Sequence, residues 1–269
     1  MKRLYIDCGM GAAGDMLTGA LLELMPDRKE ALAMLNSAGI PGIKYEAEDS
    51  VKCGVKGTHV TVTYNGEEEV TEDVNGSEAH DHGNEHTHDH GQDLSHSHHT
   101  LGDIEDIIHS LELSESVKED VIDVYEIIAE AESTAHDEPV HEVHFHEVGS
   151  MDAVADAAAV CMLMDEIAPD AVIVSDIHVG AGFVRCAHGV LPVPAPAAAN
   201  ILAGLPCYGG EVRGELCTPT GAALLKYFGT EFGTAFKENG EKQNISTGRG
   251  MGRKDFDRPN CVTVYLVTD

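Results

Sequence analysis

Residues 151–201 of this chain read MDAVADAAAVCMLMDEIAPDAVIVSDIHVGAGFVRCAHGVLPVPAPAAANI, and they indicate the fold class more clearly than any other stretch. The alanine-rich segment from Ser150 to Ala168 predicts a helix. The segment AVIVSDIHVG that follows is rich in β-branched residues and is typical of a buried strand. PAPAAANILAG predicts a second helix, because proline is favoured in the first turn of a helix. Alternation of helices and strands indicates an α/β domain.

The N-terminal sequence continues this alternation. Lys2 to Asp7 predicts a strand, and the glycines of residues 9–14 predict a turn into a helix whose apolar residues follow helical spacing. A second helix is expected over residues 26–38. Two segments with alternating character, residues 43–47 and 59–64, read as strands that pair antiparallel across a turn-rich connection.

The C-terminal sequence adds a helix, a loop and a strand. TPTGAALLKYF predicts a helix capped by Thr218 or Thr220. STGRGMGRKDF, residues 246–256, reads as a glycine-rich loop, and CVTVYLV, residues 261–267, reads as a last strand. The fold class that we predict is α/β, with a mixed sheet and flanking helices.

The composition changes between Asn65 and Thr100, where Glu, Asp, Gly, Ser, Asn and His replace nearly all large apolar side chains. Such a segment cannot bury enough apolar surface to offset the entropy of ordering, so we predict a disordered insertion that binds metal. The predicted division is residues 1–64, an N-terminal α/β part; residues 65–100, the insertion; and residues 101–269, an α/β part that forms one core with residues 1–64.

The composition also limits the partners of the chain. The formal net charge is −30, and no Lys or Arg occurs between Gly57 and Val117, which excludes nucleic acid as a partner. The apolar runs are too short for a transmembrane helix, and the N-terminus lacks the apolar core of a signal peptide, so no membrane association is expected. Seven cysteines without a CxxC pair favour reduced thiols and a cytoplasmic location.

The insertion contains a histidine tract with interspersed carboxylates. Imidazole binds nickel, zinc and copper well, and the Irving–Williams order makes flexible imidazoles favour copper and nickel over manganese or iron. A solvated linker that happens to be rich in histidine is the alternative interpretation. The candidate metal ligands here are His80, His82, His86, His88, His90, His96, His98 and His99.

A second set of candidate metal ligands lies in HFHEVGSMDAVAD, residues 144–156. On a strand His144 and His146 would share one face, with Glu147 at the end of the strand. Asp152 and Asp156 are four residues apart and would share one face of the following helix. These five side chains could converge on one ion. Alternatively, Asp152 only complements the helix dipole and Asp156 faces solvent.

The segment VGAGFVRCAHGVLPVPAPA, residues 179–197, carries a third group of candidates. Arg185 could hold a phosphate or carboxylate with two hydrogen bonds, and Cys186 with His188 could bind a soft metal or transfer a proton. The alternative is a structural turn with a buried cysteine.

The first loop spells GxGxxG with Gly9, Gly11 and Gly14, which is the dinucleotide-binding pattern. However, Asp15 puts a carboxylate where the pyrophosphate would lie, and no ribose-binding acid follows at the expected distance. Asp7 and Asp15 are better suited to a metal ion or a cationic substrate ring, which leaves backbone N–H groups for a phosphate.

These residues resemble the LarC family of nickel insertion proteins in four blocks that follow one another along nearly the whole chain. The blocks are DCGMGAAGDM (7–16), HFHEVGSMDAVAD (144–156), GAGFVRCAHGVLPVPAPA (180–197) and GELCTPTGAALL (214–225). In the first block the family pattern is D-x-x-x-G-x-x-G-D-M, so Gly9 is incidental. We expect the substrate to be bound by Asp7, Gly11, Gly14, Asp15, Arg185 and Cys186.

The resemblance implies that nickel is inserted into pyridinium-3,5-bisthiocarboxylic acid mononucleotide to form the nickel-pincer cofactor of lactate-racemase-type enzymes, through two Ni–S bonds and one Ni–C bond. This activity is that of a chelatase, or cyclometallase, of the lyase class, and it is coupled to CTP hydrolysis with Mg²⁺ or Mn²⁺. The ring carbon must lose a proton as nickel binds to it. His146, Glu147 or His188 could act as the base, and nickel as a Lewis acid would lower the barrier.

One departure from the family concerns its C-terminal region, which is associated with the nucleotide and which this chain lacks after CVTVYLVTD. A separate C-terminal LarC polypeptide is therefore an expected partner. The rival functions are a non-catalytic histidine-rich nickel metallochaperone or store, which would need only the tract, and a dehydrogenase, which would bind a nicotinamide cofactor. Homo-oligomerisation is left open.

Overall fold

A computed structural model describes residues 1–68, 72–74, 99–145, 148–186, 189–237 and 244–268 of the chain. Seven of the described strands form one mixed sheet: β1 (Lys2–Asp7), β2 (Ile43–Lys52), β3 (Val55–Tyr64), β5 (Ala171–Val174), β10 (Glu231–Phe232), β11 (Asn244–Met251) and β12 (Cys261–Thr268). Their order is β10-β5-β1-β12-β11-β3-β2, with both parallel and antiparallel neighbours. The α/β class and the mixed sheet are therefore as predicted.

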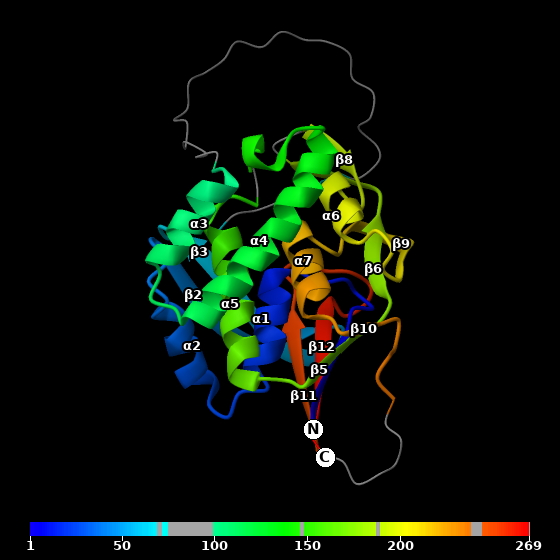
Figure 1. The fold of residues 1–269 in the computed structure, drawn as a ribbon. Helices are drawn as coiled ribbons and strands as arrows, with labels where there is room; N and C mark the ends of the chain where they lie inside the picture. The colour runs from blue at the N-terminus through cyan, green and yellow to red at the C-terminus, as the bar shows by residue number, and fades with distance from the viewer. Residues whose placement is uncertain (69–71, 75–98, 146–147, 187–188, 238–243, 269) are drawn as a thin grey trace.

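The helices, in chain order, are α1 (Gly14–Leu22), α2 (Arg28–Asn36), α3 (Leu101–Ser110), α4 (Glu115–His136), α5 (Met151–Ile167), α6 (Pro196–Ile201) and α7 (Pro219–Phe228), with a 3-10 turn at Val140–Glu142. In Figure 1 α1 lies against the large sheet, and α5 and α4 lie successively farther from it. On the opposite face, Tyr5 and Tyr265 pair across β1 and β12 and contact the ring of Phe236.

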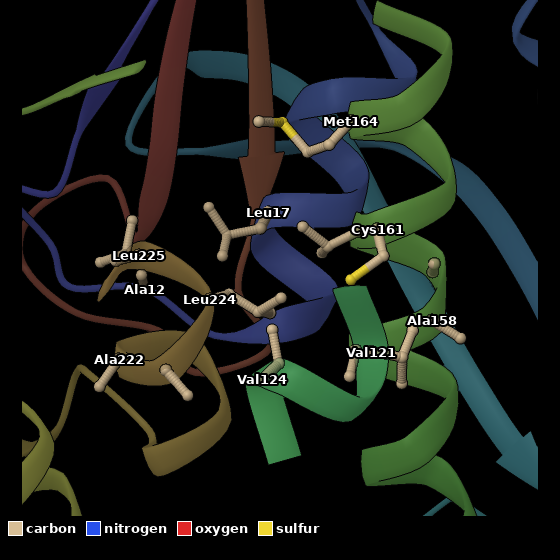
Figure 2. Close-up of a cluster of buried hydrophobic side chains, with 14 of the residues drawn as sticks. Ala12, Leu17, Val121, Val124, Ala158, Cys161, Met164, Ala222, Leu224 and Leu225 are labelled. Carbon is tan, nitrogen blue, oxygen red and sulfur yellow. The ribbon is translucent and has the colours of Figure 1, made fainter. Parts of the chain in front are cut away.

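The helices share one apolar core. Leu17 of α1, Val121 of α4, Cys161 of α5 and Leu224 of α7 point toward one another, and all four are buried (Figure 2). Burial raises the pKa of the Cys161 thiol well above its usual value, so this cysteine behaves as a small apolar side chain. The core thus fixes the relative positions of α1, α5 and α7, whose N-termini border the candidate site.

The first part of the glycine-rich segment near the C-terminus is a strand and not a loop, since β11 includes residues 246–251 of the predicted loop, whereas residues 252–256 lie in the connection to β12. β11 contains Gly248 and Gly250, which alternate along the strand and face α1. A Cβ atom at these positions would overlap the carbonyl oxygens of Ala20 and Met16, so only glycine lets α1 approach β11 this closely. The prediction was wrong for residues 246–251 because we took the glycines as a sign of a loop, whereas here they allow the strand to pack closely against α1.

Two other strand predictions need correction. β2 and β3 are longer than predicted and join through Cys53 and Gly54, both with positive φ, in a two-residue hairpin turn. The predicted single strand over residues 171–180 divides at Ser175: β5 belongs to the large sheet, whereas β6 (Ile177–Ala181) pairs with β9 (Cys207–Glu215). Here the chain leaves one sheet for another, which the hydrophobic pattern alone does not reveal.

Besides the large sheet and the pair β6-β9, a further small sheet consists of β4 (Glu72–Val74), β7 (Phe183–Cys186) and β8 (Gly189–Pro192). The predicted disordered insertion lies largely outside the described residues, as residues 69–71 and 75–98. Its described ends are tied to the rest of the fold, since β4 pairs with β7 and the backbone N–H of Phe145 donates to the carbonyl of His99. Within the part of the chain that the structure describes, no helix has the length and apolar character needed to cross a bilayer.

Candidate functional site

A cavity of about 240 Å³ opens where three helices begin. Ala13, Ser150 and Thr218, the N-cap residues of α1, α5 and α7, all line it. Because helix N-termini carry partial positive charge and unsatisfied N–H groups, three of them around one cavity favour an anionic ligand. The other lining residues are Asp15, Met16, Val60, Val62, Glu68, Val148, Asp152, Ala153, Asp156, Glu215, Leu216, Pro219, Thr220, Gly252, Arg253, Lys254 and Asn260.

The glycines of the first loop act through packing within the protein. Gly11 has φ +78, and a Cβ atom there would overlap the backbone of Leu216. A Cβ atom at Gly14 would overlap the carboxyl group of Asp156. This carboxyl group accepts a hydrogen bond from the backbone N–H of Asp15 and so occupies the N-terminus of α1. A dinucleotide would need that place for its pyrophosphate, which argues against the dehydrogenase alternative.

Asp15 and Asp156 are two half-buried carboxyl groups held close together. The pKa of Asp156 is raised well above its usual value, first by burial and then by the charges of Asp15 and Asp152. Burial also raises the pKa of Asp15, although the N–H of Met16 donates to its Oδ1 at 2.7 Å. Oδ1 of Asp156 is buried and has no hydrogen-bond partner within the described residues. A buried carboxylate oxygen without a partner is unfavourable, so a cationic ligand would stabilise this pair.

Basic and polar side chains complete the lining. Arg253 and Lys254 come from the connection between β11 and β12, and Arg253 Nη1 lies 3.3 Å from Glu68 Oε1. Asn260 Nδ2 donates to the carbonyl oxygen of Lys254 at 2.9 Å and so holds this connection in shape. Thr218 Oγ1 accepts from the N–H of Gly221 at 3.1 Å and caps α7. The cavity therefore has carboxylates for a cation beside cationic groups for an anion.

The structure brings some of the predicted site residues together and leaves others apart. Asp15, Asp152 and Asp156 line the cavity, and Gly14 lies directly beneath Asp156. Asp7 is exposed at the end of β1 and accepts a hydrogen bond from the N–H of Gly9.

Two further candidates lie outside the cavity lining. Arg185 is exposed on β7, where its backbone pairs with Glu72. His144 is exposed and lies near Asp103 with His99, since both histidines lower the pKa of that carboxyl group, after its hydrogen bonds with Thr100. Among the described residues of the predicted strand around His144, Phe145 forms a single bridge with His99, and residues 146–147 lie outside the described part of the chain.

Several candidates lie outside the described residues: His80, His82, His86, His88, His90, His96, His98, His146, Glu147 and His188, together with the side chain of Cys186. Among the residues that the structure does describe, no three His, Cys, Asp or Glu side chains are grouped closely enough to hold a metal ion by themselves. An ion held in the cavity by the described residues alone would therefore take part of its coordination from ligand or water.

Several residues of the lining were not predicted as site residues from the sequence: Glu68, Ser150, Glu215, Arg253, Lys254 and Asn260. Arg253 and Lys254 follow β11 in a stretch that we read as a glycine-rich loop, and their proximity to Asp15 depends on how the strands are ordered in the sheet. The N-cap signal at Thr218 or Thr220 was visible in the sequence, but only the fold shows that the N-termini of α5 and α7 face one cavity.

Comparison with known proteins shows which family the chain resembles. The family model described as nickel insertion protein matches residues 4–269. The chain belongs to this family. It is 40% identical over 268 residues to the pyridinium-3,5-bisthiocarboxylic acid mononucleotide nickel insertion protein of Clostridium kluyveri, and 39% identical over 279 residues to the protein of the same name from Clostridium acetobutylicum. The protein of that name from Geobacillus kaustophilus is 36% identical over 268 residues.

These alignments cover 99% of the chain but only 62%, 64% and 60% of the three relatives. The chain thus spans about three fifths of the length of the family members that it matches. No solved structure matches the chain.

Proposed function

We propose that this chain takes part in inserting nickel into pyridinium-3,5-bisthiocarboxylic acid mononucleotide, and that the substrate binds in the cavity between α1, α5 and α7. The single observation that carries the proposal is the combination of family membership with a cavity that offers both cationic and carboxylate groups. The substrate named by the relatives carries the complementary charges, a phosphate and a pyridinium ring.

The phosphate would lie toward Arg253, Lys254 and the N-termini of α5 and α7. These groups supply charge-assisted and backbone hydrogen bonds, the two kinds of donor that phosphate oxygens accept best. The pyridinium ring would lie toward Asp152, whose carboxylate also lines the cavity and would compensate its positive charge. The apolar side chains of Val60 and Val62 border the same cavity and would contact the flat ring.

Nickel is a substrate of the proposed reaction, and imidazoles suit it better than carboxylates do. We propose that the histidine tract, residues 80–99, gathers the ion and that His144 and His146 take part in its transfer. Formation of a nickel–carbon bond requires that a ring carbon lose its proton. His146, Glu147 or His188 would accept that proton, while the thiocarboxylate sulfurs bind the metal.

We further propose that the complete system is a cyclometallase of the lyase class that uses CTP with Mg²⁺ or Mn²⁺. The portion of the relatives that this chain does not match would then contribute the nucleotide-dependent part, either as a second polypeptide or within a longer protein. Homo-oligomerisation remains an open part of this proposal.

The direct experiment mixes the purified chain with nickel, CTP, Mg²⁺ and the bisthiocarboxylate mononucleotide, and follows the nickel complex by its absorption spectrum. Parallel reactions add the part of the Clostridium kluyveri relative that this chain does not match. We expect the complex to form in a reaction that requires this chain. If the complex forms equally well without the chain, the proposal is wrong.

The alternative, a nickel store without chemistry, makes a different prediction. A store depends on the histidine tract and is indifferent to the cavity. Wild-type rates of nickel insertion in Asp15→Asn, Asp156→Asn and Arg253→Ala would favour the store, whereas lower rates with unchanged nickel stoichiometry would favour insertion at the cavity.

A further inference from the structure

We propose that Asp15 and Asp156 bind a hard divalent cation, Mg²⁺ or Mn²⁺, that is distinct from the nickel ion to be inserted and that lies beside the phosphate of the bound mononucleotide. The position of the phosphate rests on the proposed function. The cation site rests on the carboxylate pair itself.

Backbone N–H groups at the start of α1 orient both carboxyl groups of the pair. The absence of a side chain at Gly14 lets the carboxyl group of Asp156 lie against the backbone where α1 begins. The N–H of Asp15 holds that carboxyl group in place, and the N–H of Met16 holds Asp15 at 2.7 Å. Both carboxyl groups are therefore oriented by rigid helical backbone before any ligand binds.

The negative charge of the two carboxylates is only partly compensated by the described residues around them. Oδ1 of Asp156 is buried and accepts no hydrogen bond within the described residues. His59, whose charge would stabilise an ionised Asp15, directs its Nδ1 to the carbonyl of Met251 at 2.9 Å. Arg253 lies close enough to act on Asp15 but forms an ion pair with Glu68. A small cation between the two carboxylates would supply the missing partner.

The atoms that the described lining residues offer to a metal ion are mainly oxygens. The described lining residues offer oxygen atoms from Asp, Glu, Ser, Thr and Asn side chains, and their nitrogen groups are the cations Arg253 and Lys254 and the amide of Asn260. They include neither a histidine nor a cysteine. Carboxylate and hydroxyl oxygens suit Mg²⁺ and Mn²⁺, whereas imidazole and thiolate suit nickel. Asp156 was expected among the nickel ligands, but apart from the thioether of Met16 the described lining offers mainly oxygen atoms as metal ligands, which favours a harder ion.

The number of carboxylates that the described residues offer to one ion also fits Mg²⁺. No three His, Cys, Asp or Glu side chains among the described residues are grouped closely enough for a metal. Mg²⁺ commonly binds through one or two carboxylates together with water and substrate phosphate oxygens. A pair of carboxylates beside Arg253, Lys254 and two helix N-termini fits this arrangement. The ion should therefore bind weakly alone and more tightly with a phosphorylated ligand.

The test measures Mn²⁺ binding to the full chain by electron paramagnetic resonance, in which free aqueous Mn²⁺ gives the signal. Nicotinamide mononucleotide serves as a pyridinium mononucleotide that carries a phosphate but no sulfur. We expect one Mn²⁺ site whose affinity rises at least tenfold with this probe. Asp15→Asn and Asp156→Asn should each weaken that site at least tenfold, and added Mg²⁺ should compete.

The matched control is Asp176→Asn, which removes one exposed carboxylate that does not line the cavity. Its Mn²⁺ affinity should equal that of the wild type. Thermal unfolding of the Asn variants is measured in parallel, and transitions at or above that of the wild type show that lost binding does not reflect lost folding.

Three results would overturn the proposal: Mn²⁺ affinity that both Asn variants retain, a Ni²⁺ affinity that falls more than the Mn²⁺ affinity in these variants, or no effect of the mononucleotide on Mn²⁺. Because Mn²⁺ binding is measured without nickel, its failure leaves nickel insertion untouched. Failed insertion with intact Mn²⁺ binding would count only against the proposed function.

Discussion

Asp156 illustrates how a single residue can be unfavourable for the fold and useful to a ligand. Its pKa is higher in the folded protein than in the unfolded chain because of burial and neighbouring carboxylates. The folded state therefore binds more protons, and stability falls as pH rises from the unfolded pKa toward and through the folded one. Asp156→Asn should stabilise the metal-free protein at pH 7 by about 1–2 kcal/mol. At pH values below the unfolded pKa, near ~4, this advantage should disappear.

Urea unfolding in the presence of a chelator, at pH 7 and at the lowest pH at which both proteins fold, checks this prediction. An Asn variant that is less stable than wild type at pH 7 would mean that Oδ1 of Asp156 already has a stabilising partner in the folded protein.

Gly14 gives a second prediction at this scale. Gly14→Ala should destabilise the protein by about 1–3 kcal/mol, because the added methyl group overlaps the carboxyl group of Asp156 at the start of α1. Gly102→Ala in α3 is the control, since a Cβ atom there meets only Thr100 Oγ1 at 3.9 Å and alanine is the better helix former. Equal stability of the two variants would contradict the close approach of α5 to α1.

At the scale of elements, the sequence predicted the helices better than the strands. α1, α5 and α7 were expected near their observed positions because the apolar spacing of α1, the alanine-rich composition of α5 and the N-cap threonine of α7 are local signals. β11 was missed because the meaning of Gly248 and Gly250 depends on α1, which is distant in the sequence. Asp15 and Asp156 could be proposed as ligands from local sequence patterns. Their proximity to Arg253 depends on contacts between distant parts of the chain and could not be predicted from the sequence.

Helix α3 offers a test of a local element. Thr100 and Asp103 form a capping box, in which Thr100 Oγ1 accepts from the N–H of Asp103 and the N–H of Thr100 donates to Asp103 Oδ2 at 2.8 Å. These hydrogen bonds lower the pKa of Asp103, so its contribution to stability is present above the unfolded pKa and is lost as pH falls through the lower folded pKa.

Thr100→Ala should remove about 1 kcal/mol of stability near pH 7. Ser110→Ala at the other end of α3 is the control, because Ser110 bonds only the carbonyl of Ile107 within its own helix. Chemical denaturation measures the free energy of unfolding of both variants. An equal decrease in Ser110→Ala would mean that the cap at Thr100 does not stabilise α3.

At the scale of the whole molecule, the two functional regions of the sequence are joined by the fold. The described ends of the histidine-rich insertion are attached near the cavity: Glu68 lines it, and His99 is bound to Phe145, three residues before Val148 of the lining. Because residues 65–68, 72–74 and 99–100 make described contacts, a deletion that tests the tract should be limited to residues 75–98, which is narrower than the segment predicted from composition.

Deletion of residues 75–98 should lower the amount of bound nickel sharply and leave thermal stability without metal nearly unchanged, since the segment contains too few apolar residues to contribute to a core. Nickel binding by the tract should also decline as pH falls below ~6.5, because only neutral imidazole coordinates metal. Isothermal titration of both proteins at two pH values measures this. Equal nickel stoichiometry with and without residues 75–98 would contradict the role of the tract.

The central claim is that the cavity between α1, α5 and α7 binds the mononucleotide, and equilibrium binding of pyridinium-3,5-bisthiocarboxylic acid mononucleotide tests it most directly. Arg253→Ala should weaken binding at least tenfold, because it removes a charge-assisted contact of about 1.5–3 kcal/mol. Arg258→Ala removes the same charge from an exposed position on the same connection, outside the cavity lining, and should bind like the wild type. Equal affinity of wild type and Arg253→Ala, or equal losses in both variants, would contradict the claim.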